Sequence, residues 1–117
     1  SARLPEMRQW IAARLGPVLP RRAEAAEALG VSERTLARRL REQEQTFEGL
    51  LDEVRRERAL QAVAEASVSL SEIAESLGFA EASTFYRAFK RWTGLPPARW
   101  RKQKLKVRLL GSKRASV

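Results

Sequence analysis

One short pattern occurs twice in this sequence and limits what the chain can fold into. Ala-Glu-x-Leu-Gly stands at residues 26–30 and again at residues 74–78, and each copy leads into a run with large apolar residues at positions i and i+4. These apolar anchors are Leu36 and Leu40 after the first copy and Phe85 and Phe89 after the second. Because residues at this spacing share one face of an α-helix, each copy predicts a helix, a turn with a glycine and a second helix.

This arrangement is a helix-turn-helix, in which the second helix can enter the major groove of duplex DNA. Its apolar side holds the helix on the protein, and its other side must offer donors to base edges. Polar and small residues lie among the anchors: Arg34, Ala37, Arg38 and Arg41 in the first copy, and Ser83, Thr84, Arg87 and Lys90 in the second. An arginine can bind O6 and N7 of guanine, a contact worth about 1–3 kcal/mol of discrimination. One arginine alone fits a solvated helix face equally well, but Arg38 and Arg87 at equivalent positions favour DNA binding.

The two copies differ in length by one residue. Gly30 precedes Leu36 by six positions, whereas Gly78 precedes Phe85 by seven. The additional residue must lie in the turn or in the first turn of the second helix, so the second copy should enter its groove differently. We therefore expect the two copies to read an asymmetric site.

The rest of the chain also reads as helix. Alanine, leucine, arginine and glutamate dominate it, and its only β-like apolar pairs are Trp10-Ile11 and Leu109-Leu110. Ser32, Thr46 and Ser69 are suitable N-caps, the last of them in a capping box. Helices are expected at roughly residues 5–15, 21–29, 33–43, 47–66, 70–77 and 82–93, with a short last helix from Pro97 to about Lys102.

The long helix over residues 47–66 has two apolar faces. The first set is Phe47, Leu50, Leu51 and Val54, and the second is Ala59, Ala62, Val63 and Ala66. The sets begin 12 residues apart, and at 100° per residue the second face is rotated by ~120° from the first. This pattern predicts a helix that docks one small body at its start and another at its end.

We therefore expect an all-α chain of two helix-turn-helix subdomains joined by a long central linker helix, with about seven helices. The expected parts are an N-terminal helix with the first subdomain over residues 1–46, the linker helix over 47–66, the second subdomain over 67–102 and a basic, flexible tail over 103–117. Trp92 and the stripe Met7, Trp10, Ile11 and Leu15 are expected in the core. The alternative for the first helix is packing against a domain outside this chain.

Charge is distributed unevenly along the chain. The formal net charge is +9, yet residues 1–81 hold 12 basic and 14 acidic residues, whereas residues 82–117 hold 11 basic residues and no acidic one. Such asymmetry indicates a polyanionic partner, which could be nucleic acid or an anionic membrane. A basic tail can also be simply a solvated end.

The composition excludes several kinds of site. The chain has no cysteine or histidine, and Asp52 is its only aspartate. Disulfides, the usual zinc sites and catalysis by cysteine or histidine are therefore excluded, and no catalytic, metal-binding or cofactor-binding residue is predicted. Because no apolar run approaches the ~20 residues of a membrane span and no signal-peptide pattern is present, we expect a soluble, cytoplasmic non-enzyme with no membrane partner. The chain opens with Ser1 instead of Met, which suggests a piece of a longer protein.

Several motifs together point to a known family. The second half contains Ser71-Glu72-Ile73-Ala74-Glu75-Ser76-Leu77-Gly78-Phe79, then Phe85, Phe89-Lys90, Gly94, Pro96-Pro97 and Trp100-Arg101. The first half contains Leu29-Gly30-Val31-Ser32 and Leu36-x-Arg38-x-Leu40, and the linker contains the stretch from Arg55 to Ala59. With these motifs, residues from about 21 to 102 resemble the DNA-binding domain of AraC/XylS-family bacterial transcription regulators. Where the family commonly has tyrosine as its last aromatic residue, this chain has Trp100, which is expected in the core.

The resemblance implies which residues read bases. On the third helix they are Arg34, Ala37 and Arg38, and on the sixth they are Ala82, Ser83, Thr84 and Arg87. Ala37 and Ala82 have no hydrogen-bonding side chain, so a thymine methyl group is the most that they can contact. Phosphate binding is expected from the N-termini of these two helices and from Ser32, Thr35, Arg39, Lys90 and Arg91. The resemblance also implies an activator, RNA polymerase as a partner, and an N-terminal effector-sensing or dimerisation domain outside this chain.

The length of the linker supports reading of two grooves. A helix of ~20 residues is about 30 Å long, and successive major grooves on one face of DNA are ~34 Å apart. A single chain could therefore place its two second helices in adjacent grooves, and a slight shortfall would favour bent DNA.

Two other interpretations remain open from the sequence. The chain could be a nucleoid-type protein that binds DNA without specificity, or a helical adaptor that binds an acidic protein partner or RNA polymerase. The tail from Lys102 to Arg114 could add non-specific affinity for DNA or could be disordered without a defined contact.

Overall fold

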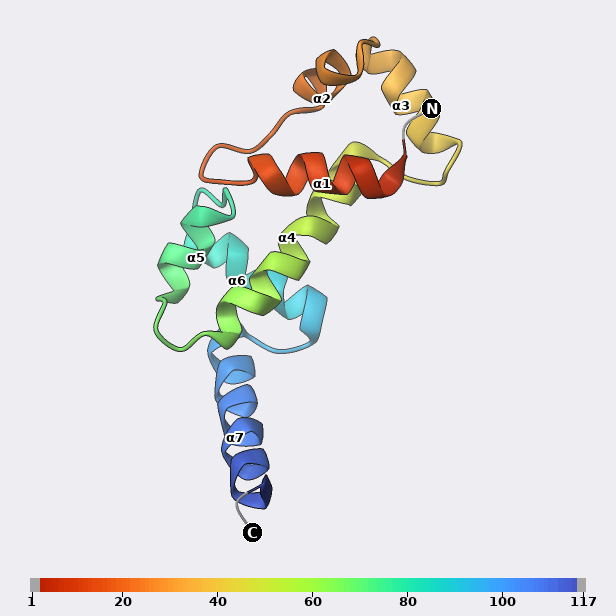
Figure 1. Cartoon of the computed structure of the whole chain (residues 1–117). Helices are drawn as coiled ribbons and strands as arrows, with labels where there is room; N and C mark the ends of the chain where they lie inside the picture. Colours follow the sequence, from red (N-terminus) through yellow and green to blue (C-terminus); the bar gives the residue numbers. More distant parts are fainter. Residues whose placement is uncertain (1–2, 116–117) are drawn as a thin grey trace.

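The computed structural model of the chain describes residues 3–115, and these form α-helices and no strand. The helices are α1 (Leu4–Arg14), α2 (Arg22–Leu29), α3 (Glu33–Arg41), α4 (Phe47–Ala64), α5 (Leu70–Ser76), α6 (Ala82–Thr93) and α7 (Pro97–Ala115) (Figure 1). The all-α architecture predicted from the sequence is confirmed, and six of the helices end within a few residues of the predicted positions.

One helix, α4, takes part in two separate hydrophobic cores. The first core joins it to α1, α2 and α3 and consists of Met7, Ile11, Ala25, Ala26, Leu36, Leu40, Phe47, Leu50 and Val54. The second core joins it to α5 and α6 and consists of Ala59, Val63, Ile73, Ala74, Leu77, Phe85 and Phe89. The two rotated faces that the sequence predicts for α4 therefore each meet their own subdomain. Figure 1 shows α2 and α3 at one end of α4, with α5 and α6 beside its other half.

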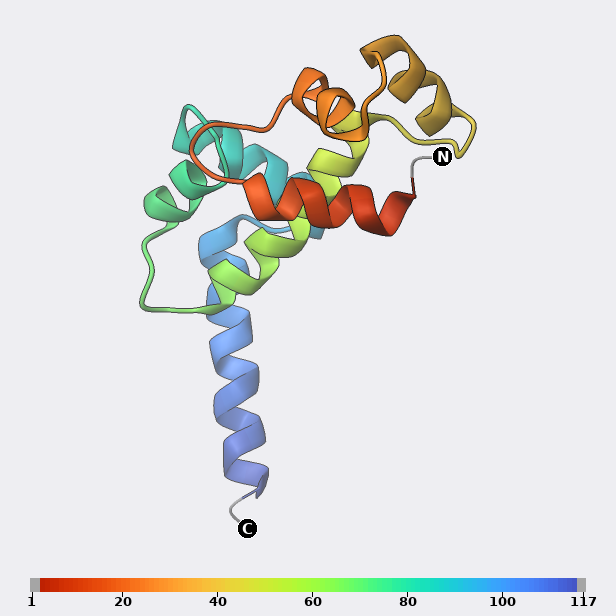
Figure 2. The same cartoon turned by 45° about the horizontal axis from the view of Figure 1, so that its top comes forward.

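The N-terminal helix α1 crosses α4 near the junction of the two cores, as both views show (Figures 1 and 2). Arg8 Nη2 of α1 lies 2.6 Å from Glu53 Oε2 of α4. Further along α4, Arg58 Nη2 donates to the Ala12 carbonyl oxygen at 2.8 Å, which satisfies one of the free carbonyl groups at the end of α1. Leu15, just after α1, packs against both cores. The crossing thus holds the two subdomains together.

The aromatic and apolar residues predicted for the core lie there. Met7 and Ile11 are buried in the first core, and Trp10 and Leu15 pack against it partly buried. Trp92 and Trp100 pack against the second core, where the Trp100 ring lies 5.4 Å from that of Phe89. The core assignment of these side chains is therefore confirmed.

The three predicted N-caps are also present. Ser32 Oγ accepts from the Thr35 amide, and Thr46 Oγ1 accepts from the Gly49 amide. Ser69 Oγ accepts from the Glu72 amide at 3.2 Å, although the part of the chain that the structure describes shows no return bond from the Glu72 carboxylate. The predicted capping box is thus half formed.

The C-terminal helix is longer than predicted. The sequence suggested that it would end near Lys102 and be followed by a flexible tail over residues 103–117, but α7 continues to Ala115. Figures 1 and 2 show it projecting from the body of the molecule. Residues 116–117 of the expected tail lie outside the described residues. Within the described residues, no helix is both long and apolar enough to cross a membrane.

The extension of α7 has a local and a tertiary cause. Residues 102–110 contain neither proline nor glycine and are mostly lysine, arginine and leucine, which favour helix. Arg101 Nε donates to the Val63 carbonyl oxygen at 2.8 Å, and Arg108 Nη1 donates to that of Ala64 at 3.3 Å. These bonds place positive charge on the free carbonyl groups at the C-terminus of α4, where it is most stabilising.

Position 78 requires a glycine, both for its backbone conformation and for the space around it. Its φ of 79° lies in the left-handed region, and a Cβ there would lie 2.7 Å from Leu19 Cγ and 3.0 Å from the Gly16 carbonyl oxygen. Gly30, the matching glycine of the first copy, has a φ of 70° but no atom within 4 Å of such a Cβ. The second turn is therefore packed against the loop that follows α1, whereas the first is open.

We expect Gly78→Ala to lower the free energy of unfolding by about 1–3 kcal/mol more than Gly30→Ala. Both substitutions carry the cost of a left-handed alanine, about 1–2 kcal/mol, and only the first adds a clash. Urea unfolding followed by tryptophan fluorescence measures both. Equal losses would contradict the close packing of Leu19 on the second turn.

Candidate nucleic-acid interface

The two candidate reading helices are held by the anchors that the sequence predicts. Leu36 and Leu40 of α3 and Phe85 and Phe89 of α6 are fully buried, each pair in its own core. Arg34, Arg38, Ser83, Thr84 and Arg87 are exposed, whereas Ala37 and Ala82 are half-buried. The structure therefore leaves the polar side of each helix available to a partner. It places the two sets of side chains on different subdomains.

The polar side of α3 carries two arginines one turn apart. Arg34 has no ion-pair or hydrogen-bond partner among the described residues, and Arg38 Nε lies 3.9 Å from Glu42 Oε1. Both side chains of this pair are more than half exposed, so the pair contributes at most about 1 kcal/mol and can open. Both arginines can thus turn to an incoming ligand.

Acidic groups near the start of α3 are partly neutralised by Arg22. Arg22 Nε lies 3.4 Å from Glu33 Oε1, and its Nη1 lies 3.8 Å from Glu48 Oε1. At the cap, Ser32 Oγ donates to Thr35 Oγ1 at 3.0 Å. The two residues predicted to bind phosphate at this end are therefore bonded to each other, which leaves the Thr35 hydroxyl hydrogen available to an acceptor.

The start of α6 is built differently. The side chain of its N-cap residue, Glu81, accepts no hydrogen bond from a backbone amide of the helix, whereas Ser32 does so at α3. Ser83 Oγ is 3.5 Å from the Glu81 carboxylate, and Arg87 has no such partner in the part of the chain that the structure describes. The free amides of this first turn suit an anion.

The structure locates the extra residue of the second copy. From N-cap to first anchor the spacing is the same, since Ser32 precedes Leu36 and Glu81 precedes Phe85 by four positions. The additional residue therefore lies in the turn, which was one of the two places that the sequence allowed. Phe79, which packs on the Phe85 ring at 5.5 Å, matches Val31 of the first copy, so the extra residue follows Phe79 in the turn.

A cleft of about 400 Å³ lies between α4 and α6, on the side of two predicted base-reading residues. Its lining consists of Asp52, Arg55, Phe79, Thr84, Arg87, Ala88 and Arg91. The structure thus brings Thr84, Arg87 and Arg91 together. The predicted phosphate-binding residues Arg39 and Lys90 do not line this cleft.

Asp52 of α4 organises the cleft. Its Oδ1 accepts from Arg91 Nη2 and its Oδ2 accepts from Trp92 Nε1, both at 3.1 Å. Arg55, one turn further along α4, donates from Nε to the Leu77 carbonyl oxygen at 2.8 Å, and its Cζ lies 3.8 Å from the Phe79 ring centroid. These bonds fix the second subdomain on the shared helix.

Sequence reasoning missed the role of both residues. Arg55 was noticed only as part of a motif, and a single aspartate among 14 acidic residues carries no pattern. Burial lowers the pKa of the Arg55 guanidinium from its ordinary value, and the nearby Asp52 carboxylate opposes this shift. Arg55 is therefore a partly desolvated cation beside the reading helix.

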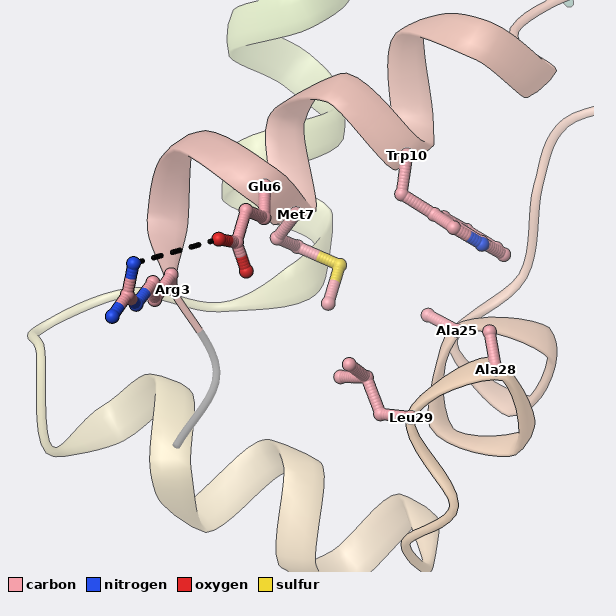
Figure 3. A pocket seen from close by; sticks show the side chains of 7 residues that line it. All are labelled: Arg3, Glu6, Met7, Trp10, Ala25, Ala28 and Leu29. Carbon is pink, nitrogen blue, oxygen red and sulfur yellow. Dashed lines mark ion pairs between the residues drawn. The ribbon is translucent and has the colours of Figure 1, made fainter.

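A second groove, of about 210 Å³, lies between α1 and α2 (Figure 3). Figure 3 shows the apolar side chains of Met7, Trp10 and Leu29 around it, with the ion pair of Arg3 and Glu6 to one side. None of the residues predicted to bind DNA lines this groove. The groove between α1 and α2 is therefore not part of the candidate interface, whereas the cleft between α4 and α6 is.

Comparison with known proteins agrees with this arrangement. The family described as "Helix-turn-helix domain" matches residues 25–103. The ornithine utilization regulator of Pseudomonas aeruginosa is 40% identical over 98 residues, which cover 84% of this chain and 29% of that regulator. The chain thus spans less than a third of the length of this relative.

Solved structures show the same fold. A DNA-binding transcriptional dual regulator from Escherichia coli K-12 superposes with a TM-score of 0.81 at 24% identity, over 91% of this chain and 96% of that one. An AraC-type DNA-binding domain-containing regulator from Chromobacterium violaceum gives 0.75 at 24% identity, over 86% and 90%. The DNA-binding domain of AdpA, solved in complex with a target DNA, gives 0.71 at 25% identity, over 88% and 93%.

A double-mutant cycle tests the anchoring of α6. We expect Trp92→Phe, which removes the indole N–H together with part of the ring, to lower the free energy of unfolding by about 1 kcal/mol for the lost hydrogen bond in addition to the cost of the smaller ring, and to leave the Asp52 oxygen unpaired. In an Asp52→Ala background the same change should cost much less, because the acceptor is already gone. Urea unfolding of the four proteins gives the coupling energy. Arg91→Gln, which removes the more exposed bond to the same carboxylate, should cost less, and additive effects of the first two changes would refute the bond.

Proposed function

Because the chain belongs to the AraC/XylS family, as the DNA-binding domain of its transcription regulators, we propose that it reads one asymmetric duplex site with α3 and α6 in successive major grooves. The observation that supports this proposal is the attachment of two exposed, polar helices to the two ends of α4. Members of the family bind DNA in a sequence-specific manner, and one solved relative is a complex with its target DNA.

The dimensions of α4 suit two adjacent grooves. The helix has 18 residues, a length of about 27 Å, while grooves on one face are ~34 Å apart. The residual difference favours DNA that bends toward the protein, at a cost of a few kcal/mol that the second set of contacts offsets. The arrangement does not require a second copy of the chain.

We assign base reading to the exposed polar side chains of the two helices. Arg34 and Arg38 serve the first groove, and Ser83, Thr84 and Arg87 serve the second. Ala37 and Ala82 can add only apolar contact with a thymine methyl group. Since the two sets differ in chemistry and the second turn is one residue longer, the two half-sites differ in sequence.

We assign phosphate binding to groups at the edges of both helices. At α3 these are Ser32, Thr35 and Arg39, together with the free amides of the first turn. At α6 they are the uncapped N-terminus and the exposed Lys90 and Arg91. These contacts carry little sequence information and make binding dependent on salt.

In the intact protein we propose that this domain works as a transcription activator in the bacterial cytoplasm, at the nucleoid. RNA polymerase would be its protein partner, and an N-terminal effector-sensing or dimerisation domain would regulate it. This chain covers only 29% of the length of the ornithine utilization regulator, which supports an additional N-terminal domain in the intact protein. The C-terminal helix α7, basic throughout its described part, adds non-specific affinity for DNA.

Selection of bound sequences from a random duplex pool tests the proposal. We expect one motif of roughly two helical turns, with Arg38→Ala and Arg87→Ala each relaxing a different half-site at a cost of about 1–3 kcal/mol. Arg14→Ala on α1 is the charge-matched control and should leave the motif unchanged. If the pool yields no motif, binding is non-specific. If both arginine variants weaken every sequence equally, the assignment of base reading is wrong.

A further inference from the structure

Arg55 is a half-buried cation that forms no ion pair within 4 Å among the described residues, although the Asp52 carboxylate lies close enough to act on its charge. Among the described residues it donates one hydrogen bond, from Nε to the Leu77 carbonyl oxygen, and stacks on Phe79. No ion pair within the part of the chain that the structure describes involves its two Nη atoms. A guanidinium that is partly removed from water is stabilised when charged acceptors replace the lost hydration. Arg55 therefore has capacity to bind an anion that the fold does not use.

The surroundings of Arg55 are suited to an anion. Arg55, Arg87 and Arg91 line the same cleft, and Asp52 is the only acidic residue in its lining. Both oxygens of Asp52 are already engaged, by Arg91 and by Trp92. The carboxylate thus holds the Arg91 guanidinium at the edge of the cleft, while its own charge is offset. The lining retains an excess of positive charge.

The position of the cleft connects it to the reading helix. Thr84 and Arg87 line it, and both side chains are also assigned to the edges of bases. A duplex docked on this side of α6 therefore brings one strand of its backbone across the opening. Because Asp52 and Arg55 belong to α4, the cleft lies on the helix that joins the two subdomains.

We propose that this cleft seats one phosphate of the DNA backbone, bound from two sides by Arg55 and Arg91, between the two grooves that α3 and α6 read. This inference rests on the proposed docking of α6 in a major groove. Asp52 acts as a positioning residue, because it orients Arg91 and does not touch the phosphate. The planar guanidinium of Arg55 suits this role, because Nε can keep its hydrogen bond to the Leu77 carbonyl oxygen while the Nη atoms donate to the phosphate oxygens.

The contact would link the shape of the protein to that of the DNA. Arg55 is tied to the turn of the second subdomain through Leu77 and Phe79. A phosphate held there is fixed relative to α4 and α6 at once. The DNA backbone between the two half-sites is then held at one distance from α4. Base pairs that no side chain contacts can therefore influence affinity, because their sequence determines how easily the DNA bends.

The experiment uses the duplex selected for the wild-type chain, with a neutral methylphosphonate replacing one phosphate at a time between the half-sites. We expect one or two adjacent central positions at which the replacement weakens wild-type binding about tenfold. In Arg55→Gln and in Arg91→Gln the same replacement should cost clearly less than in the wild type, because one of the two arginines is gone, and in the double variant its effect should be less than about twofold. Arg14→Gln, whose side chain lies outside the cleft, should retain the wild-type penalty.

Folding and the proposed function are controlled separately. Urea unfolding and the retention of the selected motif show whether Arg55→Gln still folds and reads bases, and the exposed Arg91→Gln provides the second, milder variant. Absence of any sensitive central phosphate in the wild-type chain overturns the inference, as does a penalty that is undiminished in folded Arg55→Gln and in Arg91→Gln. Failure to select any motif would instead reject the proposed function.

Discussion

The fold depends on one constraint, which is that a single unbroken helix belongs to two hydrophobic cores. Phe47, Leu50 and Val54 of α4 pack into the first core, and Ala59 and Val63 pack into the second. Each subdomain alone would have only a few helices and a small core, which is marginal for a body of this size. The shared helix gives each of them a buried surface and sets their relative positions. The distance between the reading helices is therefore a consequence of how the cores are built.

Polar contacts at the junction fix the position of the two subdomains relative to α4. From α4, Glu53 and Arg58 hold α1. Asp52 and Arg55 of the same helix hold the turn and the end of the second helix-turn-helix. Successive residues of one helix thus bind different elements, because side chains one position apart point about 100° away from each other. These contacts fix the relative position of the two subdomains, which the proposed reading of half-sites at one spacing requires.

Much of the fold could be predicted because its signals are local and repeated. The paired anchors, the caps at Ser32, Thr46 and Ser69, and the two rotated faces of α4 each follow from side-chain periodicity or from capping chemistry. The length of α7 is signalled only in part, by the helix-favouring residues 102–110, because the bonds of Arg101 and Arg108 reach carbonyl groups more than thirty positions away. The cleft was missed for the same reason, since Asp52 meets Arg91 and Trp92 only in three dimensions.

The central claim is that α4 fixes the spacing of two reading helices on one face of the DNA. It is tested most directly by measuring affinity for the selected site after base pairs are inserted between its two halves. We expect a steep loss on inserting about five base pairs, which turns the second groove to the opposite face, and no recovery at about ten, since an 18-residue helix cannot reach the next groove. Equal affinity at all spacings would contradict it.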